Sequence, residues 1–236
     1  MPDNPGIEKP GPHRPRNAMY LPPHFAEGRP EVLQRFVREH PFGLLVTQGP
    51  EGIVANGIPF VLDNDGLDGP GFLRAHVARA NPVWRETRTE LECLVVFQGA
   101  QAYVSPGWYP AKAEHGKVVP TWNYIMVQAR GSVRFIDDAA WLHAFVSRLT
   151  QRHEASQALP WAVTDAPADY VDGMLRAIVG VEIVLTSLVG KWKVSQNRSA
   201  ADREAVTRAL ATLPGSDAAA MARAVGEAGS GPGPRG

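Results

Sequence analysis

Residues 122–136 read WNYIMVQARGSVRFI and form the longest run of β-strand character in the chain. β-Branched and aromatic residues dominate this run, and Gly131 in its middle suits a bulge or a bend. A second run of the same kind, VGVEIVLTSLVGKWKV, covers 179–194 and is also interrupted by a glycine. We therefore expect the two runs to pair as long strands, with helical patterns at 137–153 and 168–178 inserted between them.

Shorter elements are predicted on either side of these runs. A helix begins at Pro30 and ends before Pro41, and a last helix runs from the cap Ser199 to about Leu213. Strand patterns fall at 43–48, 53–63, 72–78, 93–98 and 102–105. Strands of irregular spacing, joined mostly by hairpins, indicate a mainly β, α+β fold: a six-stranded antiparallel barrel with peripheral helices.

Glycine and proline concentrate at the two ends of the chain. Five prolines lie in the first 18 residues, which have no hydrophobic period, so we expect a disordered arm over 1–18. The glycine-rich end of the sequence predicts a flexible tail over 214–236. The remaining residues, 19–213, are of the right length for one domain.

Composition restricts the classes of function. Lys and Arg number 24 and Asp and Glu number 24, so the chain has no long-range basic field for nucleic acid. Cys93 is the one cysteine, which excludes an intrachain disulfide and favours a reducing compartment. No apolar run reaches the roughly 18 residues of a membrane span, so the sequence predicts a cytoplasmic protein without a membrane partner.

Common catalytic and metal-binding motifs are missing. The seven histidines include no H-x-H or H-E-x-x-H, so no metal site is expected. The sequence has no G-x-S-x-G, no G-x-x-x-x-G-K-[ST] and no G-x-G-x-x-G between a strand pattern and a helix pattern. Triad hydrolases, P-loop NTPases and Rossmann dinucleotide binding therefore have no support.

The stretch 72–84, FLRAHVARANPVW, predicts a strand followed by a helix that begins at Asn81 and Pro82. Arg74, His76 and Arg79 lie near this junction, where guanidinium donors and the free N–H groups of a helix end would converge. Such a set suits a phosphate monoester. The alternative is an ordinary strand-to-helix turn that carries two arginines.

Aromatic and amide side chains gather around a long loop, among them Tyr103, Trp122, Asn123 and Tyr124. Flat rings and amides suit a planar heteroaromatic ligand, but the same residues are enriched at dimer interfaces. Both interpretations hold if a ligand lies between subunits. The segment KWKVSQNR at 191–198 adds Lys193 and Gln196 as donors, or is a solvated strand end.

Together these segments resemble a known family. The blocks MYLPPHF (19–25), AHVARANPVW (75–84), VVFQGAQAYVSPGWY (95–109), VPTWNY (119–124) and KVSQNR (193–198) occur in the order found in PaiB-type FMN-binding negative transcriptional regulators. These regulators belong to the FMN-binding split-barrel superfamily. The segment AKAEHGK (111–117) is longer than is usual in that family.

The resemblance implies a six-stranded antiparallel split barrel that forms a homodimer, with FMN as cofactor at each subunit interface. By the same resemblance, Asn56 and Ile58 would lie beside the flavin ring. The phosphate would lie at Arg74, His76, Arg79 and Asn81. The ring or ribityl chain would be approached by Trp122, Asn123 and Tyr124, from the second subunit in one arrangement, while Lys193 and Gln196 close the pocket.

Three functions remain open at this point. A PaiB-like negative transcriptional regulator is the function that the resemblance implies. An FMN-dependent oxidoreductase or flavin reductase of the same fold is the first alternative, with no catalytic residue identified, and a dimeric scaffold that has lost flavin binding is the second. Because the net charge is zero and no DNA-reading motif is present, direct DNA binding has the least support.

Overall fold

Two long antiparallel strands organise the computed structural model, which describes residues 19–64 and 69–228. Strand β7 (Thr121–Ile136) pairs with β8 (Ile178–Lys193) over nearly its whole length, as the sequence predicts. The register shifts between Arg130 and Gly131, so the predicted bulge is confirmed. A Cβ at Gly131 would collide with the backbone of Val184, so only glycine allows β8 to approach here.

The sheet contains eight strands among the described residues, in the order β3-β2-β6-β7-β8-β5-β4, with β1 paired to β8. Besides β7 and β8 these are β1 (Ala26–Glu27), β2 (Phe42–Gly49), β3 (Gly52–Pro59), β4 (Val61–Asp63), β5 (Phe72–Ala78) and β6 (Cys93–Val104). The antiparallel α+β class is confirmed. Six strands are not, because two short strands are added and the hydrogen-bonded sheet is not closed.

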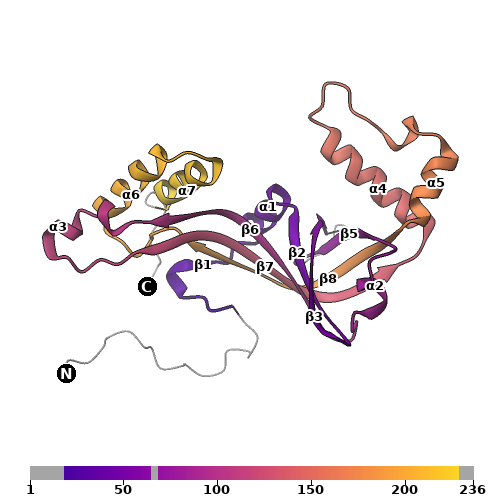
Figure 1. The fold of residues 1–236 in the computed structure, drawn as a ribbon, viewed down its shortest axis with the longest axis horizontal. Helices are drawn as coiled ribbons and strands as arrows, with labels where there is room; N and C mark the ends of the chain where they lie inside the picture. The colour runs from indigo at the N-terminus through magenta and orange to yellow at the C-terminus, as the bar shows by residue number, and fades with distance from the viewer. Residues whose placement is uncertain (1–18, 65–68, 229–236) are drawn as a thin grey trace.

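Two hydrophobic clusters divide the molecule into lobes joined by the long strands β6, β7 and β8 (Figure 1). One cluster fills the first lobe, between the sheet and α1 (Pro30–Glu39). The other lies beneath α6 (Ala200–Thr212) and α7 (Ser216–Glu227). Ile125 and Trp192 pack against both clusters, so they form the joint between the lobes.

The remaining helices cover the ends of the sheet. They are the short α2 (Val83–Glu86) and α3 (Ala111–His115), then α4 (Ala139–Glu154) and α5 (Ala168–Arg176), with short 3-10 turns at Pro23–Phe25, Pro106–Trp108 and Val163–Asp165. Helix α6 begins as predicted, because the Ser199 hydroxyl accepts a hydrogen bond from the backbone N–H of Asp202 at 3.2 Å. None of the helices in the described ranges is long and apolar enough to span a membrane.

Helix α7 corrects the expectation of a flexible tail over 214–236. Residues Ser216–Glu227 are helical. Met221 and Val225 are fully buried and belong to the second hydrophobic cluster, together with residues of α6. The predicted arm at 1–18 and the last part of the predicted tail, 229–236, lie outside the described residues.

Candidate functional site

Two amide side chains meet where β3 faces the turn before α2. The Asn81 Nδ2 donates to the Asn56 Oδ1 at 2.9 Å, and the Asn81 Oδ1 accepts from the Val83 backbone N–H at 3.0 Å. The Asn56 Nδ2 is buried and has no hydrogen-bond partner among the described residues. A buried amide donor without an acceptor costs free energy, so an acceptor from outside the chain is expected here.

Strand β3 presents an open edge beside this amide pair. It is the first strand of the sheet order and pairs only with β2, so alternate backbone groups along its other edge have no strand partner. Several large apolar side chains of this hairpin are exposed: Phe42, Leu44, Ile53 and Val54. The surface therefore combines free hydrogen-bonding groups with apolar area, which suits a planar ligand or a second chain.

Arg79 is held in place by the protein itself. Its Nε donates to the Arg176 carbonyl at 2.6 Å, and its two terminal nitrogens donate to the Asp137 carboxylate at 2.8 and 2.5 Å. A further N–H donates to the Ile178 carbonyl at 3.1 Å. The hydrogen bond from Arg79 lowers the pKa of Asp137. Four of the five guanidinium N–H groups are thus used, and one remains for an external anion.

The other residues predicted around the phosphate lie in different surroundings. Arg74 forms ion pairs with Glu182 and Asp63. Ile58, which is predicted beside the flavin ring and not at the phosphate, is 4% exposed and belongs to the first hydrophobic cluster. His76 packs against Phe145 of α4, with ring centroids 6.0 Å apart. Helix α2 has only four residues, so its end supplies little of the expected positive field. The structure brings Asn56 and Asn81 together, and Arg79 lies two residues before Asn81 in the sequence.

His76 gives a prediction about pH. Burial lowers the pKa of its imidazole, and the buried Nδ1 has no hydrogen-bond partner. The unfolded chain then binds a proton more readily, so the folded state loses stability as the pH falls below about 6.5. We expect His76→Gln to lose less stability than the wild type between about pH 7.5 and 5.5, measured by urea unfolding at each pH. Equal losses in the two proteins would show that His76 is not the group responsible.

A second group of predicted residues lies at the far ends of β7 and β8. The Lys193 Nζ donates to the Thr121 Oγ1 and to the Trp122 carbonyl, each at 2.5 Å. Burial, followed by the nearby charges of Lys191 and Arg198, lowers the pKa of Lys193. Trp122 is 49% exposed and its ring lies 6.1 Å from that of Tyr103. This end of the hairpin therefore presents an exposed aromatic pair beside a partly desolvated ammonium group.

The remaining members of this group have internal partners. Asn123 is buried and its Nδ2 donates to the Ser195 Oγ at 2.9 Å. The Gln196 amide bonds to the backbone of Val194 and Trp192, and the Lys191 ammonium lies 5.4 Å from the Tyr124 ring centre. These three side chains shape the strand ends, and Trp122 and Lys193 are the ones placed to meet a ligand.

The two groups are too far apart in one chain to hold one small molecule. Ala78, just before Arg79, pairs with Ile178 at the start of β8, whereas Lys193 ends that strand. At about 3.3 Å per residue, the intervening strand is on the order of 50 Å long. The amide pair and the Trp122 group lie in different lobes (Figure 1). Both can contact one ligand only if two copies of the chain contribute.

Sequence reasoning missed a cleft of about 760 Å³ between α1 and α7. Gln196 is the one predicted site residue that lines it. The cleft needs helix α7, whose alanine-rich sequence has little hydrophobic signal of its own. The i, i+4 pairs of opposite charge in α1 and α7 are the signal that could have pointed to it.

Comparison with known proteins gives a family match. Residues 19–187 match the model described as "Putative FMN-binding domain". An uncharacterized protein of Emericella nidulans is 36% identical over 85% of this chain and 93% of its own length. The "Protease synthase and sporulation protein PAI 2" of Bacillus subtilis is 29% identical over 78% of this chain and 85% of its own.

Solved structures share the fold at low sequence identity. A conserved hypothetical protein from Mycobacterium tuberculosis has a TM-score of 0.53, 14% identity, and coverage of 84% of this chain and 99% of its own. The flavocytochrome Anf3 from Azotobacter vinelandii has a TM-score of 0.51 and 10% identity, over 71% of this chain and 69% of its own. At these identities the similarity concerns the fold alone.

Proposed function

Because the chain belongs to the family of putative FMN-binding domains, we propose that it is a homodimeric flavoprotein with one FMN at each of two equivalent sites between subunits. The family match confirms FMN as the expected cofactor. The observation that carries the proposed placement is the buried, unpartnered Asn56 Nδ2 beside the open edge of β3. Flavin carbonyls are acceptors of the kind this donor lacks.

The donor set fits the ring of FMN. Asn56 would donate from its Nδ2, and Asn81 holds the Asn56 amide in orientation through the 2.9 Å hydrogen bond. The free backbone groups along the edge of β3 would bond the polar rim of the ring, and apolar residues of the hairpin would exclude water from it. FMN, when bound, supplies a centre that accepts and releases electrons, which no side chain here could do.

For the phosphate we propose Arg85 together with the remaining N–H of Arg79. The Arg85 guanidinium is exposed, lies 4.4 Å from the Trp84 ring centre, and has no ion-pair partner in the described part of the chain. Stacking on Trp84 would orient it without using its donors. Arg74, by contrast, is committed to Glu182 and Asp63.

We place the second subunit so that its Trp122 and Lys193 complete each site. The exposed apolar side chains on the β2–β3 hairpin and the exposed Tyr103 and Trp122 then become buried surface in the dimer. Only Phe60 separates β3 from β4. Counted as one bent strand, and with β1 left aside as two residues, they make six main strands, the number in the proposed split barrel.

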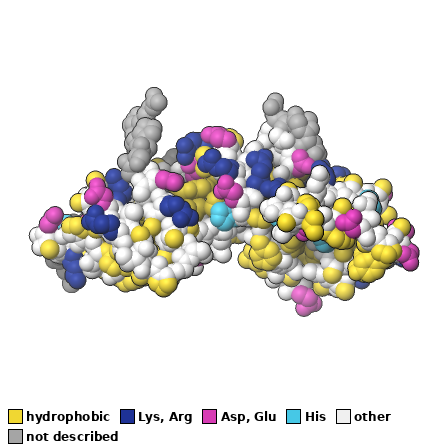
Figure 2. All heavy atoms as spheres, turned by 90° about the horizontal axis from the view of Figure 1, so that it is seen from above, with side chains coloured by type: hydrophobic (Ala, Val, Ile, Leu, Met, Phe, Trp, Pro, Cys, Tyr) yellow, Lys and Arg dark blue, Asp and Glu magenta, His cyan; other side chains and the backbone are white. Residues whose placement is uncertain are grey.

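For the biological role we propose regulation of gene expression in the cytoplasm, as in PaiB-type proteins, with the flavin as the sensing group. The Bacillus subtilis relative is named for protease synthesis and sporulation, which supports a regulatory role. Basic and acidic side chains are intermingled on the face in Figure 2, which favours indirect action over DNA binding.

An FMN-dependent oxidoreductase is the second candidate, supported by the name of the flavocytochrome of similar fold. Oxidation of NAD(P)H by the FMN-loaded protein, without a shift of promoter DNA, would favour the second candidate.

A substitution at Asn56 tests the ring site. We expect Asn56→Ala to bind FMN about 5- to 10-fold more weakly, because one hydrogen bond to the ring is lost. Titration of the apo-protein with FMN, followed by quenching of flavin fluorescence, measures the change. Gln157→Ala is the control, since Gln157 is exposed just after α4 and belongs to neither group of proposed site residues. Equal affinities of wild type and Asn56→Ala would remove Asn56 from the site, and a wild type that takes up no FMN would contradict the proposed function.

A further inference from the structure

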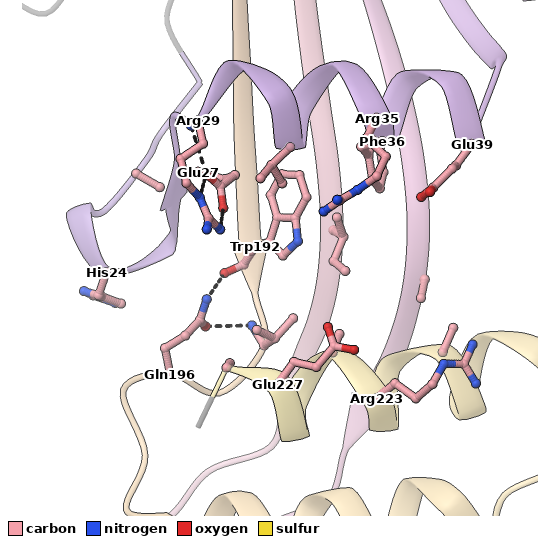
Figure 3. A pocket seen from close by; sticks show the side chains of 18 of the residues that line it. His24, Glu27, Arg29, Arg35, Phe36, Glu39, Trp192, Gln196, Arg223 and Glu227 are labelled. Atoms are coloured by element: carbon pink, nitrogen blue, oxygen red, sulfur yellow. Dashed lines mark hydrogen bonds and ion pairs between the residues drawn. The ribbon is translucent and has the colours of Figure 1, made fainter. Parts of the chain in front are cut away.

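A cleft lies between α1 and α7, and it is separate from the amide pair at β3. Its volume of about 760 Å³ falls within the range of small-molecule sites. Figure 3 shows α1 forming one wall and α7 the other, with the strand residue Trp192 between them. The cleft therefore bridges the first lobe, which contains α1, and the lobe that carries α6 and α7.

The floor of the cleft is apolar and is fixed by close packing. Phe36, Ile125 and Trp192 line it, and the rings of Phe36 and Trp192 meet edge to face at 5.3 Å. A Cβ at Gly99 would come within 2.7 Å of the Phe36 ring, so this glycine lets α1 lie directly on β6. The floor is thus preformed, which reduces the entropic cost of binding an apolar group.

Charges of opposite sign alternate along both walls. Helix α1 carries Arg35 and Glu39 one turn apart, and α7 carries Arg223 and Glu227 in the same order. In Figure 3 the Arg35 and Glu227 side chains reach into the space from the two walls. None of the four forms an ion pair within the described chain, whereas Arg29 and Glu27 at the rim pair with each other. Each wall therefore offers one cation and one anion with unused hydrogen-bonding capacity, and the apolar floor lies between the two walls.

We propose that this cleft binds a small zwitterion that carries an apolar group: an α-amino acid or a short peptide. Arg35 would bind the carboxylate in a bidentate manner, and Glu227 would accept from the ammonium group. The apolar side chain would lie on Trp192 and Ile125. A simple anion is disfavoured by Glu39 and Glu227, and an uncharged apolar ligand would leave the charged walls unmatched.

Calorimetry with L-phenylalanine and L-leucyl-L-phenylalanine as probes tests this proposal. We expect both to bind, and N-acetyl-L-phenylalanine and L-phenylalaninamide, which each lack one charge, to bind at least about tenfold more weakly. Arg35→Gln and Glu227→Gln should weaken binding of L-phenylalanine by a similar factor. Glu31→Gln is the control, since Glu31 is exposed on α1 and does not line the cleft.

A charge exchange sharpens the test. The double variant Arg35→Glu, Glu227→Arg should bind L-phenylalanine more tightly than either Arg35→Gln or Glu227→Gln. The two charges have exchanged walls, so the ligand can bind in the opposite direction. Circular dichroism of each variant checks that these changes at exposed positions leave the fold intact. If neither probe binds, or if binding survives both single changes, the proposal is overturned. The same titration on Asn56→Ala should be unchanged, so failure here is distinguishable from failure at the flavin site.

Discussion

Arg74→Met is expected to lower the free energy of unfolding by about 3–5 kcal/mol. The reason is Glu182, which is 1% exposed and whose Oε2 accepts from the Arg74 Nε at 2.7 Å. Without Arg74, the buried carboxylate keeps Arg134 as its one ion-pair partner in the part of the chain that the structure describes. The Arg134 side chain is 66% exposed, although its Nε lies 2.7 Å from the other carboxylate oxygen. Urea unfolding at neutral pH, followed by circular dichroism, measures the loss.

Two further variants separate the buried pair from ordinary surface charge. Arg148→Met removes a hydrogen bond of 2.8 Å to Asp63, but its side chain is half exposed, so the loss should be below about 1 kcal/mol. The double variant Arg74→Met, Glu182→Met should recover much of the lost stability, because no buried charge remains. If instead Arg74→Met is as stable as the wild type but binds FMN more weakly, Arg74 is a phosphate-binding residue, as the sequence predicts.

Arg74 shows why residue type alone could not separate the two roles. An arginine near a strand-to-helix turn has the same appearance in sequence whether it binds a phosphate or a carboxylate of its own chain. Its partner Glu182 is 108 residues away, and the two meet only because β5 pairs with β8 in a register that places Arg74 opposite Glu182. That register depends on the whole sheet, and no local pattern encodes it.

The elements that could be predicted are those with a strong local signal. The long strands, helix α1 and the Ser199 cap carry β-branched runs, an amphipathic stripe or a capping residue, and each is present. Helix α7 has no such signal, because its buried face is built from alanines with Met221 and Val225, and its stability comes from packing on α6. The same tertiary dependence hid the cleft.

The types of residue in the candidate site could be predicted from the sequence, but their relative positions in space could not. Both the Asn81 region and the Trp122 region carry side chains suited to a flavin, and the resemblance assigns them to one site. Strand pairing places them in different lobes of one chain, as the separation along β8 shows. Because of this separation, the proposed site requires the second subunit to supply Trp122 and Lys193. From the sequence, a contribution from the second subunit was one of the possible arrangements.

Mixing two variants that bind FMN weakly should therefore restore full affinity at some of the sites. The first variant, Asn56→Ala with Asn81→Ala, removes the pair of amide side chains. The second variant, Trp122→Ala with Lys193→Ala, removes the two side chains that the other lobe contributes. We expect each variant alone to bind FMN at least about tenfold more weakly than the wild type. In a dimer with one copy of each, one interface keeps both intact groups, so about half of the sites should bind FMN with full affinity. Flavin absorbance per heterodimer, isolated through two different affinity tags, measures this fraction.

The outcome depends on geometry and not on general stabilisation by a partner. If both groups of one chain served the same FMN, every site in the heterodimer would contain a damaged group, and mixing would restore nothing. Dimers of the Asn56→Ala, Asn81→Ala variant that carry both tags control for the purification and should show no site with full affinity for FMN. A protein that light scattering shows to be a monomer while it binds FMN fully would contradict the shared site. Recovery of about half of the sites requires Trp122 or Lys193 of one copy to act with Asn56 or Asn81 of the other.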